Sequence, residues 1–400
     1  MPSFSATFSD EQVNELVAYI RTGIENVDEY KFQEVALEPD TFQSEDFAYI
    51  IDTVASGFSS VWGIAFLPNN DMLVTDKSGE LYRIDEYENK TQIRGVPPLR
   101  YEGQGGLMDV EVHPDFESNS TVYLTYSIFK PEGEDTLTTT AVSRFVLDND
   151  ELKEGDLIFE ALPYSTRRHH YGSRLEFDDE GYLFVTVGDR GARNENPQNL
   201  SLFPGKVHRI YDDGRIPEDN PFVNVDTAVA SVYSYGHRNP QGITKHPVTG
   251  KMWEHEHGPR GGDELNIIEA GLNYGWPIVS YGINYDGTVF TSQTSKDGMQ
   301  QPNLFWVPSI APCGMDFVES DKYPGWDGHL LVGSLRFEYL NLCKVEGDKV
   351  ISEEKLLKNI GRVRVVRQGN DGYIYVGVER PGAIYRIVPE DEFAMVNTFL

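Results

Sequence analysis

Cysteine is scarce in this sequence, with only Cys313 and Cys343 among 400 residues. Two thiols exclude a cysteine-rich metal cluster and a framework of several disulfides. They leave either one bridge or two isolated buried thiols, and we favour the isolated thiols. No Cys-x-x-Cys-His motif is present, so the sequence predicts no covalently attached haem.

Long apolar runs and basic residues are also few. No stretch reaches the length of about 18 apolar residues that a membrane-spanning helix needs, so we expect no membrane insertion. The first residues, MPSFSATFSDEQ, lack the basic and apolar regions of a secretory signal. Lys and Arg number 34 against 64 Asp and Glu, a net charge of −30. Such a surface disfavours nucleic acid or an anionic bilayer as a partner.

What the sequence does contain is enough for one large domain, with 39% hydrophobic and 12% aromatic residues. After about residue 50, short alternating apolar runs are separated by turn residues, with almost no 3.6-residue periodicity. This pattern is typical of strands. The sequence therefore predicts an all-β fold.

A strand–turn–strand unit recurs along the chain, with a mean spacing of about 60 residues. The copies begin at Gly63, Asp109, Arg174, Gly242, Gly314 and Val363. Radial repetition of such a unit predicts a six-bladed β-propeller with insertions in some blades. A β-sandwich with long loops is the alternative, but it does not explain why the unit recurs up to the C-terminus.

The N-terminal segment differs in kind. Ser9 and Gln12 form a capping box, and apolar residues follow at helical spacing from Val13 to Ile20. We expect a short amphipathic α-helix over residues 10–21.

Two polar segments frame the fourth repeat: YGHRNPQG at residues 235–242 and EHGPRGGDELN at residues 256–266. Proline and glycine leave backbone carbonyls without ladder partners, and such carbonyls together with carboxylates suit a hard cation such as Ca²⁺. The alternative is that both segments are only tight turns.

His170 is a candidate general base, and Asp189 is the candidate carboxylate that orients it. Asp189 ends the strand that follows the hairpin beginning near Arg174, so its carboxylate can approach the imidazole of His170 at one mouth of the propeller. A carboxylate bonded to one ring nitrogen fixes the tautomer and makes the other nitrogen more basic.

Four arginines, Arg238, Arg336, Arg362 and Arg364, stand at blade entrances or exits in an otherwise acidic chain. Guanidinium groups that converge on a channel suit an anion with several carboxylates. Alternatively, each pairs with a neighbouring Asp or Glu, and the acidic composition favours that alternative.

Five motifs together carry a family resemblance: GQGGLMDVEVHPDF, HHYGSRLEFDDEGYLFVTVGD, YGHRNPQGI, EHGPRGGDELNIIEAGLNYGWP and GRVRVV. In this order, over residues 61–388, the sequence resembles the soluble PQQ-dependent aldose sugar dehydrogenases, or glucose/sorbosone dehydrogenases. The resemblance implies a six-bladed propeller that oxidises the anomeric hydroxyl of aldoses to lactones, using pyrroloquinoline quinone (PQQ) held with Ca²⁺ at the channel mouth.

The resemblance also implies roles for single residues. His170 would be the general base, oriented by Asp189, and also a cofactor neighbour. Arg238, beside Asn239, would stabilise the oxyanion on the quinone. The remaining cofactor contacts would come from Gln104, Trp306, Arg336, Arg362 and Arg364. Trp306 could face the ring system or the sugar, or be a hydrophobic plug.

The metal ligands are likewise implied by the resemblance. Gly258 and Pro259 would offer main-chain carbonyls to the Ca²⁺ that grips the quinone, and Asp263 would support them through water. Glu264 and Tyr274, ten residues apart, would bind a second, structural Ca²⁺, the tyrosine through its carbonyl.

Three positions depart from the family pattern. Arg336 stands where lysine is usual, which keeps the charge but changes the donor geometry. Val365 follows Arg364 where aspartate is common, which leaves the orientation of Arg364 open. His169 precedes the base, and two adjacent imidazoles shift each other's protonation.

The first 23 residues resemble the last segment of a c-type cytochrome, in which Met-Pro supplies an axial methionine and a helix follows. We therefore divide the chain into an N-terminal helical segment, residues 1–45, and a propeller dehydrogenase domain, residues 46–400. The hypothesis is that the sequence is the C-terminal part of a longer dehydrogenase–cytochrome fusion or begins at an internal methionine; the alternative is an ordinary N-terminal helix packed on the propeller. We expect a periplasmic or secreted bacterial protein with a c-type cytochrome as electron acceptor.

Two other functions compete with this reading. Six-bladed propellers with a channel Ca²⁺ and a histidine base also serve as lactonases, and a propeller can be a non-catalytic binding module. The arginine set separates the first, because a neutral lactone does not require it. Intact His170, Asp189 and Arg238 argue against the second.

Overall fold

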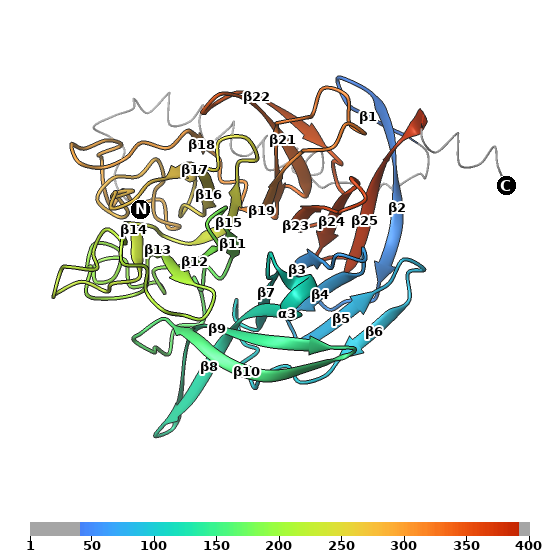
Figure 1. Ribbon diagram of the computed structural model, residues 1–400. Coiled ribbons are helices and arrows are strands. Elements are labelled where there is room, and N and C mark those ends of the chain that lie inside the picture. The colour runs from blue at the N-terminus through green and yellow to red at the C-terminus, as the bar shows by residue number, and fades with distance from the viewer. Residues whose placement is uncertain (1–40, 392–400) are drawn as a thin grey trace, which may run out of the picture. The chain divides into compact units, whose positions relative to one another are not determined.

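Six antiparallel sheets surround a central axis in the computed structural model, which describes residues 41–391 (Figure 1). The first strands of successive sheets are neighbours and form a closed ring, β3–β7–β11–β15–β19–β23. The predicted all-β, six-bladed β-propeller is confirmed. Each of the six sequence repeats supplies the two innermost strands of one blade.

The blades follow one another along the chain. Blade 1 has β3 (Val61–Phe66), β4 (Met72–Asp76), β5 (Glu80–Ile84) and β6 (Lys90–Ile93); blade 2 has β7 (Leu107–Val112), β8 (Thr121–Glu132), β9 (Asp135–Asp148) and β10 (Glu151–Glu160). Blade 3 has β11 (Leu175–Phe177), β12 (Tyr182–Val187), β13 (Lys206–Tyr211) and β14 (Val232–Tyr235); blade 4 has β15 (Pro240–Lys245), β16 (Met252–Glu256), β17 (Asp263–Ile268) and β18 (Leu304–Trp306). Blade 5 has β19 (Pro312–Phe317), β20 (Leu330–Ser334), β21 (Tyr339–Glu346) and β22 (Lys349–Leu356); blade 6 has β23 (Val363–Gln368), β24 (Ile374–Val378), β25 (Ala383–Pro389), β2 (Ala48–Ser56) and β1 (Phe42–Gln43). A four-residue helix, α3 (Phe116–Asn119), joins β7 to β8.

The ring closes through strands from both ends of the described chain. β2 pairs antiparallel with β25, so that Ile51 lies opposite Ile387, and β1 extends the same sheet (Figure 1). Blade 6 therefore combines strands from before blade 1 with the last strands of the chain. This arrangement ties the first blade to the last and restricts how far the ring can open.

The turn residues of the repeats act as the sequence predicts. The β11–β12 turn is held by Asp178, whose carboxylate accepts the backbone N–H groups of Glu180 (3.1 Å) and Tyr182 (2.8 Å). Gly181, in the same turn, has φ = 82°, a conformation that side chains rarely adopt. An aspartate that caps its own turn in this way sets the hairpin register of the inner strands.

One buried arginine links all six blades at the centre of the ring. Arg174 precedes β11 in blade 3 and stacks on the indole of Trp62, 4.0 Å from the ring centroid. Its guanidinium pairs with Asp109 at 3.0 Å. Its other partners are the carbonyls of Trp62, Gln241 and Arg364 and the thiol of Cys313, on blades 1, 4, 6 and 5. Arg174 thus connects the inner strands of the six blades through its own side chain.

Two further expectations concern the thiols and the membrane. Cys313 and Cys343 are both free and buried, in β19 and β21, as favoured from the sequence. Among residues 41–391, no helix is long and apolar enough to span a membrane. The predicted helix at residues 10–21 and its cytochrome-like segment lie outside the described residues, so the division of the chain at residue 45 stays a prediction.

Candidate active site

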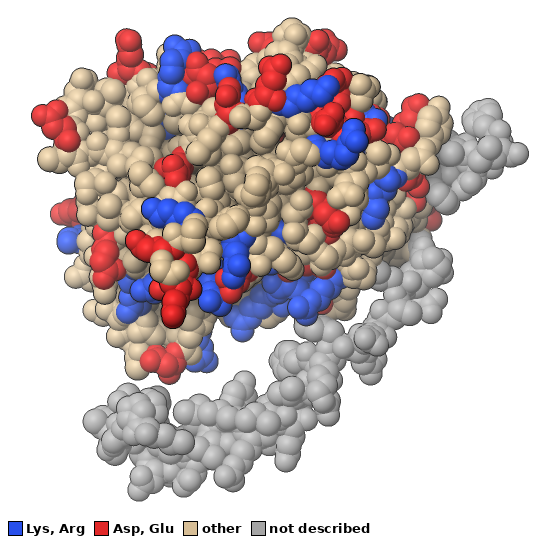
Figure 2. All heavy atoms as spheres, turned by 90° about the horizontal axis from the view of Figure 1, so that it is seen from below, with Lys and Arg blue, Asp and Glu red and all other residues tan. Residues whose placement is uncertain are grey.

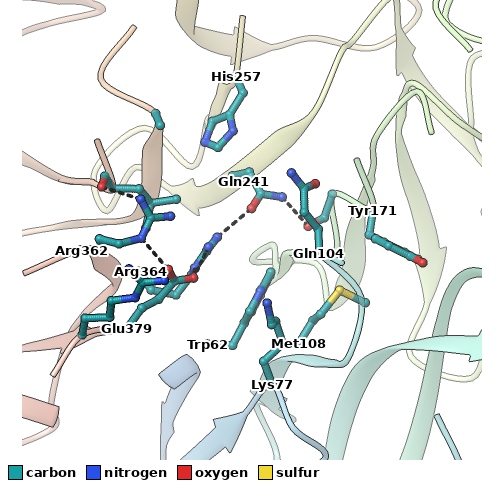
Figure 3. Close-up of a pocket in the computed structure, with 14 residues that line it drawn as sticks. Trp62, Lys77, Gln104, Met108, Tyr171, Gln241, His257, Arg362, Arg364 and Glu379 are labelled. Atoms are coloured by element: carbon teal, nitrogen blue, oxygen red, sulfur yellow. Dashed lines mark hydrogen bonds and ion pairs between the residues drawn. The ribbon is translucent and has the colours of Figure 1, made fainter. Parts of the chain in front are cut away.

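Two cavities lie at one end of the central channel and share Gln104. The inner cavity has a volume of about 480 Å³, and its lining includes Trp62, Lys77, Gln241, His257, Arg362, Arg364, Glu379 and Arg380 (Figure 3). The outer cavity, of about 640 Å³, is lined by residues that include Arg167, His169, His170, Asp189, Arg193, Glu195, Arg238, Pro259, Trp276, Asn284 and Tyr285. Most of the predicted site residues therefore meet at this end of the propeller.

The structure brings His170 and Asp189 together. Nδ1 of His170 lies 2.6 Å from Oδ1 of Asp189. Burial would raise the pKa of Asp189, but its hydrogen bond with His170 and nearby charges outweigh burial and lower the pKa. An ionised carboxylate can only accept, so Nδ1 carries the proton and Nε2 is left as the basic nitrogen. The predicted base-and-orienter geometry is present.

His170 is held neutral. Burial and the nearby guanidinium of Arg238 lower its pKa to about 4, although Asp189 acts in the opposite direction. His169 contributes a smaller lowering, and its ring lies 4.6 Å from that of His170. His169 thus influences the pKa of the base, as its position next to His170 suggests.

The backbone of the base is also fixed. His170 has φ = 57°, in the left-handed region that non-glycine residues rarely adopt. Its N–H donates to Oε1 of Gln104 at 2.7 Å. Gln104 therefore does more than line both cavities, because it holds the base in an otherwise unfavourable conformation.

Trp276 anchors Asp189 from the other side. Its indole N–H donates to Oδ2 of Asp189 at 2.8 Å, while the backbone N–H of Gly191 donates to Oδ1 at 2.6 Å. The guanidinium of Arg238 lies 5.4 Å from the indole ring centroid. Trp276 thus contacts both Asp189 and Arg238. It was not predicted as a site residue, although it stands in one of the family motifs.

Arg190 supports the loop that carries the base. The side chain is 1% exposed, and its guanidinium lies 3.6 Å from the ring centroid of Tyr171. It donates to the carbonyls of Arg167 and His169, immediately before His170. A buried arginine that bonds backbone carbonyls in this way limits the movement of the loop.

Arg238 faces the glycine-rich segment. Its Nη1 donates to the carbonyls of His257 (2.8 Å) and Gly258 (2.7 Å), and it has no carboxylate ion pair within residues 41–391. Its backbone N–H is clamped by the carboxylate of Glu256. Asn239 lies behind it, where its side-chain oxygen accepts the N–H of Gly172 at 3.3 Å.

The sequence left open whether Arg362 and Arg364 face the channel or pair with a neighbouring carboxylate, and in the structure they do both. They line the inner cavity, and each also pairs with Glu379, which lies between them (Figure 3). Burial would raise the pKa of Glu379, but the two arginines lower it to about 2. Lys77 and Arg380 add two more cations to the lining, so that one carboxylate faces four positive side chains.

Arg364 is oriented by other side chains, although Val365 stands where an aspartate is common. Glu379 binds Nε of Arg364 at 2.8 Å, and Nη1 donates to Oε1 of Gln241 at 3.0 Å. Val365 itself is 1% exposed and packs in a hydrophobic cluster between blades 6 and 1. Glu379 thus supplies the carboxylate that position 365 lacks.

Three predicted cofactor contacts, Asn239, Trp306 and Arg336, lie outside the lining of both cavities. Trp306 packs in the hydrophobic core between blades 4 and 5, and its indole N–H donates to Glu353 at 2.7 Å. This placement matches the hydrophobic plug rather than a residue that faces a ring or sugar. Arg336 is exposed, and its guanidinium donates to the carbonyl of Ser309 at 3.2 Å.

The glycine-rich loop is built around Asp263. Its carboxylate accepts the N–H groups of Gly258 and Ala311 and the hydroxyl of Ser309, all within 2.9 Å. Burial raises the pKa of Asp263 to about 6 against these donors. A Cβ on Gly258 would lie 2.4 Å or less from the carbonyls of Gly261 and Gly262. Asp263 therefore supports the loop by direct hydrogen bonds, where the sequence suggested a water.

The loop offers oxygens to a cation. The carbonyl of Gly258 accepts one hydrogen bond, from Arg238, and retains a second lone pair. Pro259 lines the outer cavity and has no N–H of its own. These neutral oxygens beside a cavity that could hold an anion fit a hard cation such as Ca²⁺.

Glu264 and Tyr274 belong to a second group of oxygens. With Glu256 they line a narrow cleft, and Glu264 lies opposite Glu256 in the β16–β17 register. Burial, followed by repulsion from Glu256, raises the pKa of Glu264. Glu256 also lies with His237 and Glu254 in a buried cluster whose ligand atoms are within 4.8 Å of one another. Carboxylates gathered in this way suit a divalent cation.

A positional signal could have found the missed residues. In four blades the residue directly after the second strand lines the inner cavity: Lys77, His257, Leu335 and Glu379. In blade 3 the second residue after that strand, Asp189, lines the outer cavity, and of these residues it alone was predicted. Aligning the six repeats by their second strands would have added Lys77 and Glu379 to the candidates.

The fold and the site define a six-bladed propeller with a histidine–carboxylate pair beside a cationic cavity at one end of its channel. A sequence model described as "Glucose / Sorbosone dehydrogenase" matches residues 58–386. The chain therefore belongs to the glucose/sorbosone dehydrogenase family, as its motifs predict.

Individual relatives agree with this assignment. The aldose sugar dehydrogenase YliI of Escherichia coli K12 is 40% identical over 338 residues, which cover 82% of this chain and 90% of that protein. The crystal structure of the soluble aldose sugar dehydrogenase from Escherichia coli in its apo form superimposes with a TM-score of 0.80 at 36% identity, covering 86% of this chain and all of that one. The PQQ-bound aldose sugar dehydrogenase of Streptomyces coelicolor gives a TM-score of 0.70 at 26% identity and covers 86% of this chain and 98% of that one.

Proposed function

We propose that this protein is a PQQ- and Ca²⁺-dependent oxidoreductase that oxidises the anomeric hydroxyl of aldoses to lactones. The observation that carries the proposal is the pairing of two cavities: a cationic inner one and an outer one that contains a neutral histidine base, with Gln104 common to both. Family membership supports the reaction class.

The base acts on the sugar in the outer cavity. Nε2 of His170 removes the proton of the anomeric hydroxyl, while Asp189 holds Nδ1–H and stabilises the imidazolium that forms. Trp276 keeps the carboxylate of Asp189 in place. Because the base is nearly enclosed, the proton passes to His170 with little competition from bulk water.

The inner cavity suits an anion with several carboxylates. Arg362, Arg364, Lys77 and Arg380 give it a positive charge that Glu379 only partly balances. These side chains and Gln104 would hold the carboxylates and oxygens of PQQ, and Arg238, with Asn239 next to it in the chain, would stabilise negative charge that develops on the quinone. PQQ supplies the two-electron acceptor for the hydride that leaves the anomeric carbon. Trp306 and Arg336, which lie outside the lining, have no part in this proposal.

Calcium would bind at the loop that faces Arg238. The carbonyls of Gly258 and Pro259 are its protein ligands in this proposal, and Asp263 fixes the loop that presents them. A structural Ca²⁺ would bind at Glu264 and the carbonyl of Tyr274, near Glu256. The electron acceptor would be a c-type cytochrome and the location the bacterial periplasm or the exterior, in keeping with the cytochrome-like N-terminal sequence.

A lactonase function is less well supported. A neutral lactone would use the base and the cation but gives no task to the four cations of the inner cavity, which are costly to gather without an anion. The test is reconstitution: the purified protein is mixed with PQQ and Ca²⁺ and assayed for dye reduction with several aldoses. We expect activity that requires both additions. Aldose-independent or cofactor-independent results, or hydrolysis of lactones in their place, would overturn the proposal.

A further inference from the structure

Most arginines of the described chain are neutralised by carboxylates. Examples are Arg144 with Asp156, Arg209 with Asp219 and Arg386 with Asp52. On the face that Figure 2 shows, basic and acidic side chains are interspersed. An acidic excess of this size makes such pairing easy, so an arginine without a carboxylate partner stands out.

Arg167 and Arg193 are such arginines, and both line the outer cavity that contains His170. Within residues 41–391, no carboxylate oxygen lies within 4.0 Å of either guanidinium. Glu195 lines the same cavity but pairs with neither of them. Asp189, the other carboxylate of the lining, is already engaged by His170, Trp276 and Gly191.

Each of these guanidinium groups is anchored by one nitrogen only. Nη1 of Arg167 donates to the carbonyl of Gly191 at 3.1 Å. Nη1 of Arg193 donates to Oδ1 of Asn284 at 2.7 Å, and its guanidinium lies 4.7 Å from the ring centroid of Phe290. The planar groups are thus oriented, while further N–H donors remain for a ligand.

The two arginines line the outer cavity, as does Arg238, whereas the other cations assigned to the cofactor, Lys77, Arg362, Arg364 and Arg380, line the inner cavity. His169, beside them, is kept neutral because burial and Arg190 lower its pKa. Oriented guanidinium donors in the sugar cavity can recognise an anionic substituent of the sugar, which they can bind with two parallel hydrogen bonds. A neutral aldose would offer the remaining N–H donors of both arginines only uncharged oxygens.

We propose that Arg167 and Arg193 form an anion subsite in the outer cavity, so that the preferred substrate is an aldose that carries a carboxylate or phosphate away from its anomeric carbon. The inference rests on the proposed function, because it takes the outer cavity as the sugar site. It adds a substrate class that the family assignment does not specify.

The test compares three substrates of the reconstituted holoenzyme at equal ionic strength: D-glucose, D-glucuronate and D-glucose 6-phosphate. We expect kcat/KM to be at least about tenfold higher for one or both anionic sugars than for glucose, and this preference to shrink as salt is added. The better of the two identifies the anion as carboxylate or phosphate. Equal or lower kcat/KM for both anionic sugars would overturn the proposal.

Variants locate the effect. Arg167→Met and Arg193→Met should each lower kcat/KM for the preferred anionic sugar about tenfold more than for glucose. Arg193→Lys should retain part of the preference, because it keeps the charge but loses the planar donor geometry. The matched control is Arg94→Met, since Arg94 is exposed, pairs with Glu151 and lies away from both cavities. Equal losses for the anionic sugar and glucose would contradict the subsite.

A binding measurement separates this inference from the proposed function. If no aldose is oxidised with PQQ and Ca²⁺, the reaction proposal fails, and calorimetric titration of the same protein with D-glucuronate and with glucose 6-phosphate still tests the subsite. Binding that Arg193→Met weakens supports it. Failure of both anionic sugars to bind overturns it.

Discussion

The indole N–H of Trp276 donates a 2.8 Å hydrogen bond to the carboxylate oxygen of Asp189 that does not face His170. Trp276 thereby connects the loop after β17 to Asp189, which follows β12, and so to His170. The relationship makes Trp276 a positioning residue for Asp189 and, through it, for His170, and its side chain also lines the outer cavity.

Trp276→Phe should keep an aromatic side chain at this position and remove the indole N–H donor. A hydrogen bond to a charged group contributes about 1.5–3 kcal/mol, so we expect kcat to fall about tenfold or more. Asp189 would then carry a less dispersed charge, which raises the pKa of His170 and moves the acid limb of the pH profile to higher pH. A merely structural role would lower the amount of folded enzyme without moving that limb. A pH–rate profile of the variant beside the wild type distinguishes the two.

The low pKa of His170 predicts activity in mild acid. The base works only when neutral, and its pKa is about 4, so kcat/KM should be retained as pH falls through 6 and 5 and be lost near 4. An ordinary histidine, with a pKa near 6.5, would lose activity about two pH units earlier. The same depression means that the unfolded chain takes up the proton first, so this residue's contribution to stability declines between about pH 6.5 and 4. Circular dichroism at each pH must show that the enzyme remains folded, and an acid limb centred near 6.5 in folded enzyme would contradict the assignment.

Arg362→Met should weaken PQQ binding. Arg364 continues to neutralise Glu379, so the substitution removes one cation from the inner cavity without leaving a buried charge alone. Loss of one charged hydrogen bond predicts a dissociation constant about tenfold or more higher, measured by titrating the apo-protein with PQQ. Arg94→Met is the control, and an unchanged dissociation constant for Arg362→Met would remove this arginine from the cofactor site.

Asp263→Asn should raise the Ca²⁺ concentration needed for reconstitution. The N–H groups of Gly258 and Ala311 donate to different oxygens of Asp263, so an asparagine turns its NH₂ group toward one of them, which disturbs the loop that presents the carbonyls. We expect the half-maximal Ca²⁺ concentration to rise about tenfold, at saturating PQQ. Asp156→Asn, at an exposed ion pair with Arg144, serves as the control. The same Ca²⁺ requirement in Asp263→Asn and wild type would contradict the role of the loop.

The sequence predicted the blades well because the signals are local. The turn after Phe177 uses an aspartate and a glycine, and Asp, Asn, Gly or Pro in the turns of the other repeats marks their inner hairpins. The pairing of β2 with β25 could not be predicted, because the two strands are more than 300 residues apart and neither sequence indicates which strand it pairs with. The link of Arg174 to all blades is hidden for the same reason, because most of its partners are backbone carbonyls that any sequence would provide.

The candidate site was predictable where one motif held both partners, as for His170 and Asp189. It was less so where a contact depends on the tilt of a strand. Trp306 stands at the expected place in the chain, but β18 is the outermost strand of its blade, and its indole packs toward blade 5. Glu379 was missed because its importance appears only when Arg362 and Arg364 are seen on either side of it.

The most direct test of the account uses His170→Ala in the reconstituted protein. PQQ titration and turnover with an aldose that the wild type oxidises are measured on the same preparation. Removal of a general base predicts a PQQ dissociation constant within a few-fold of the wild type and a kcat lower by about two orders of magnitude or more. Turnover equal to that of the wild type would contradict the assignment of His170, and with it the reaction proposed for the paired cavities.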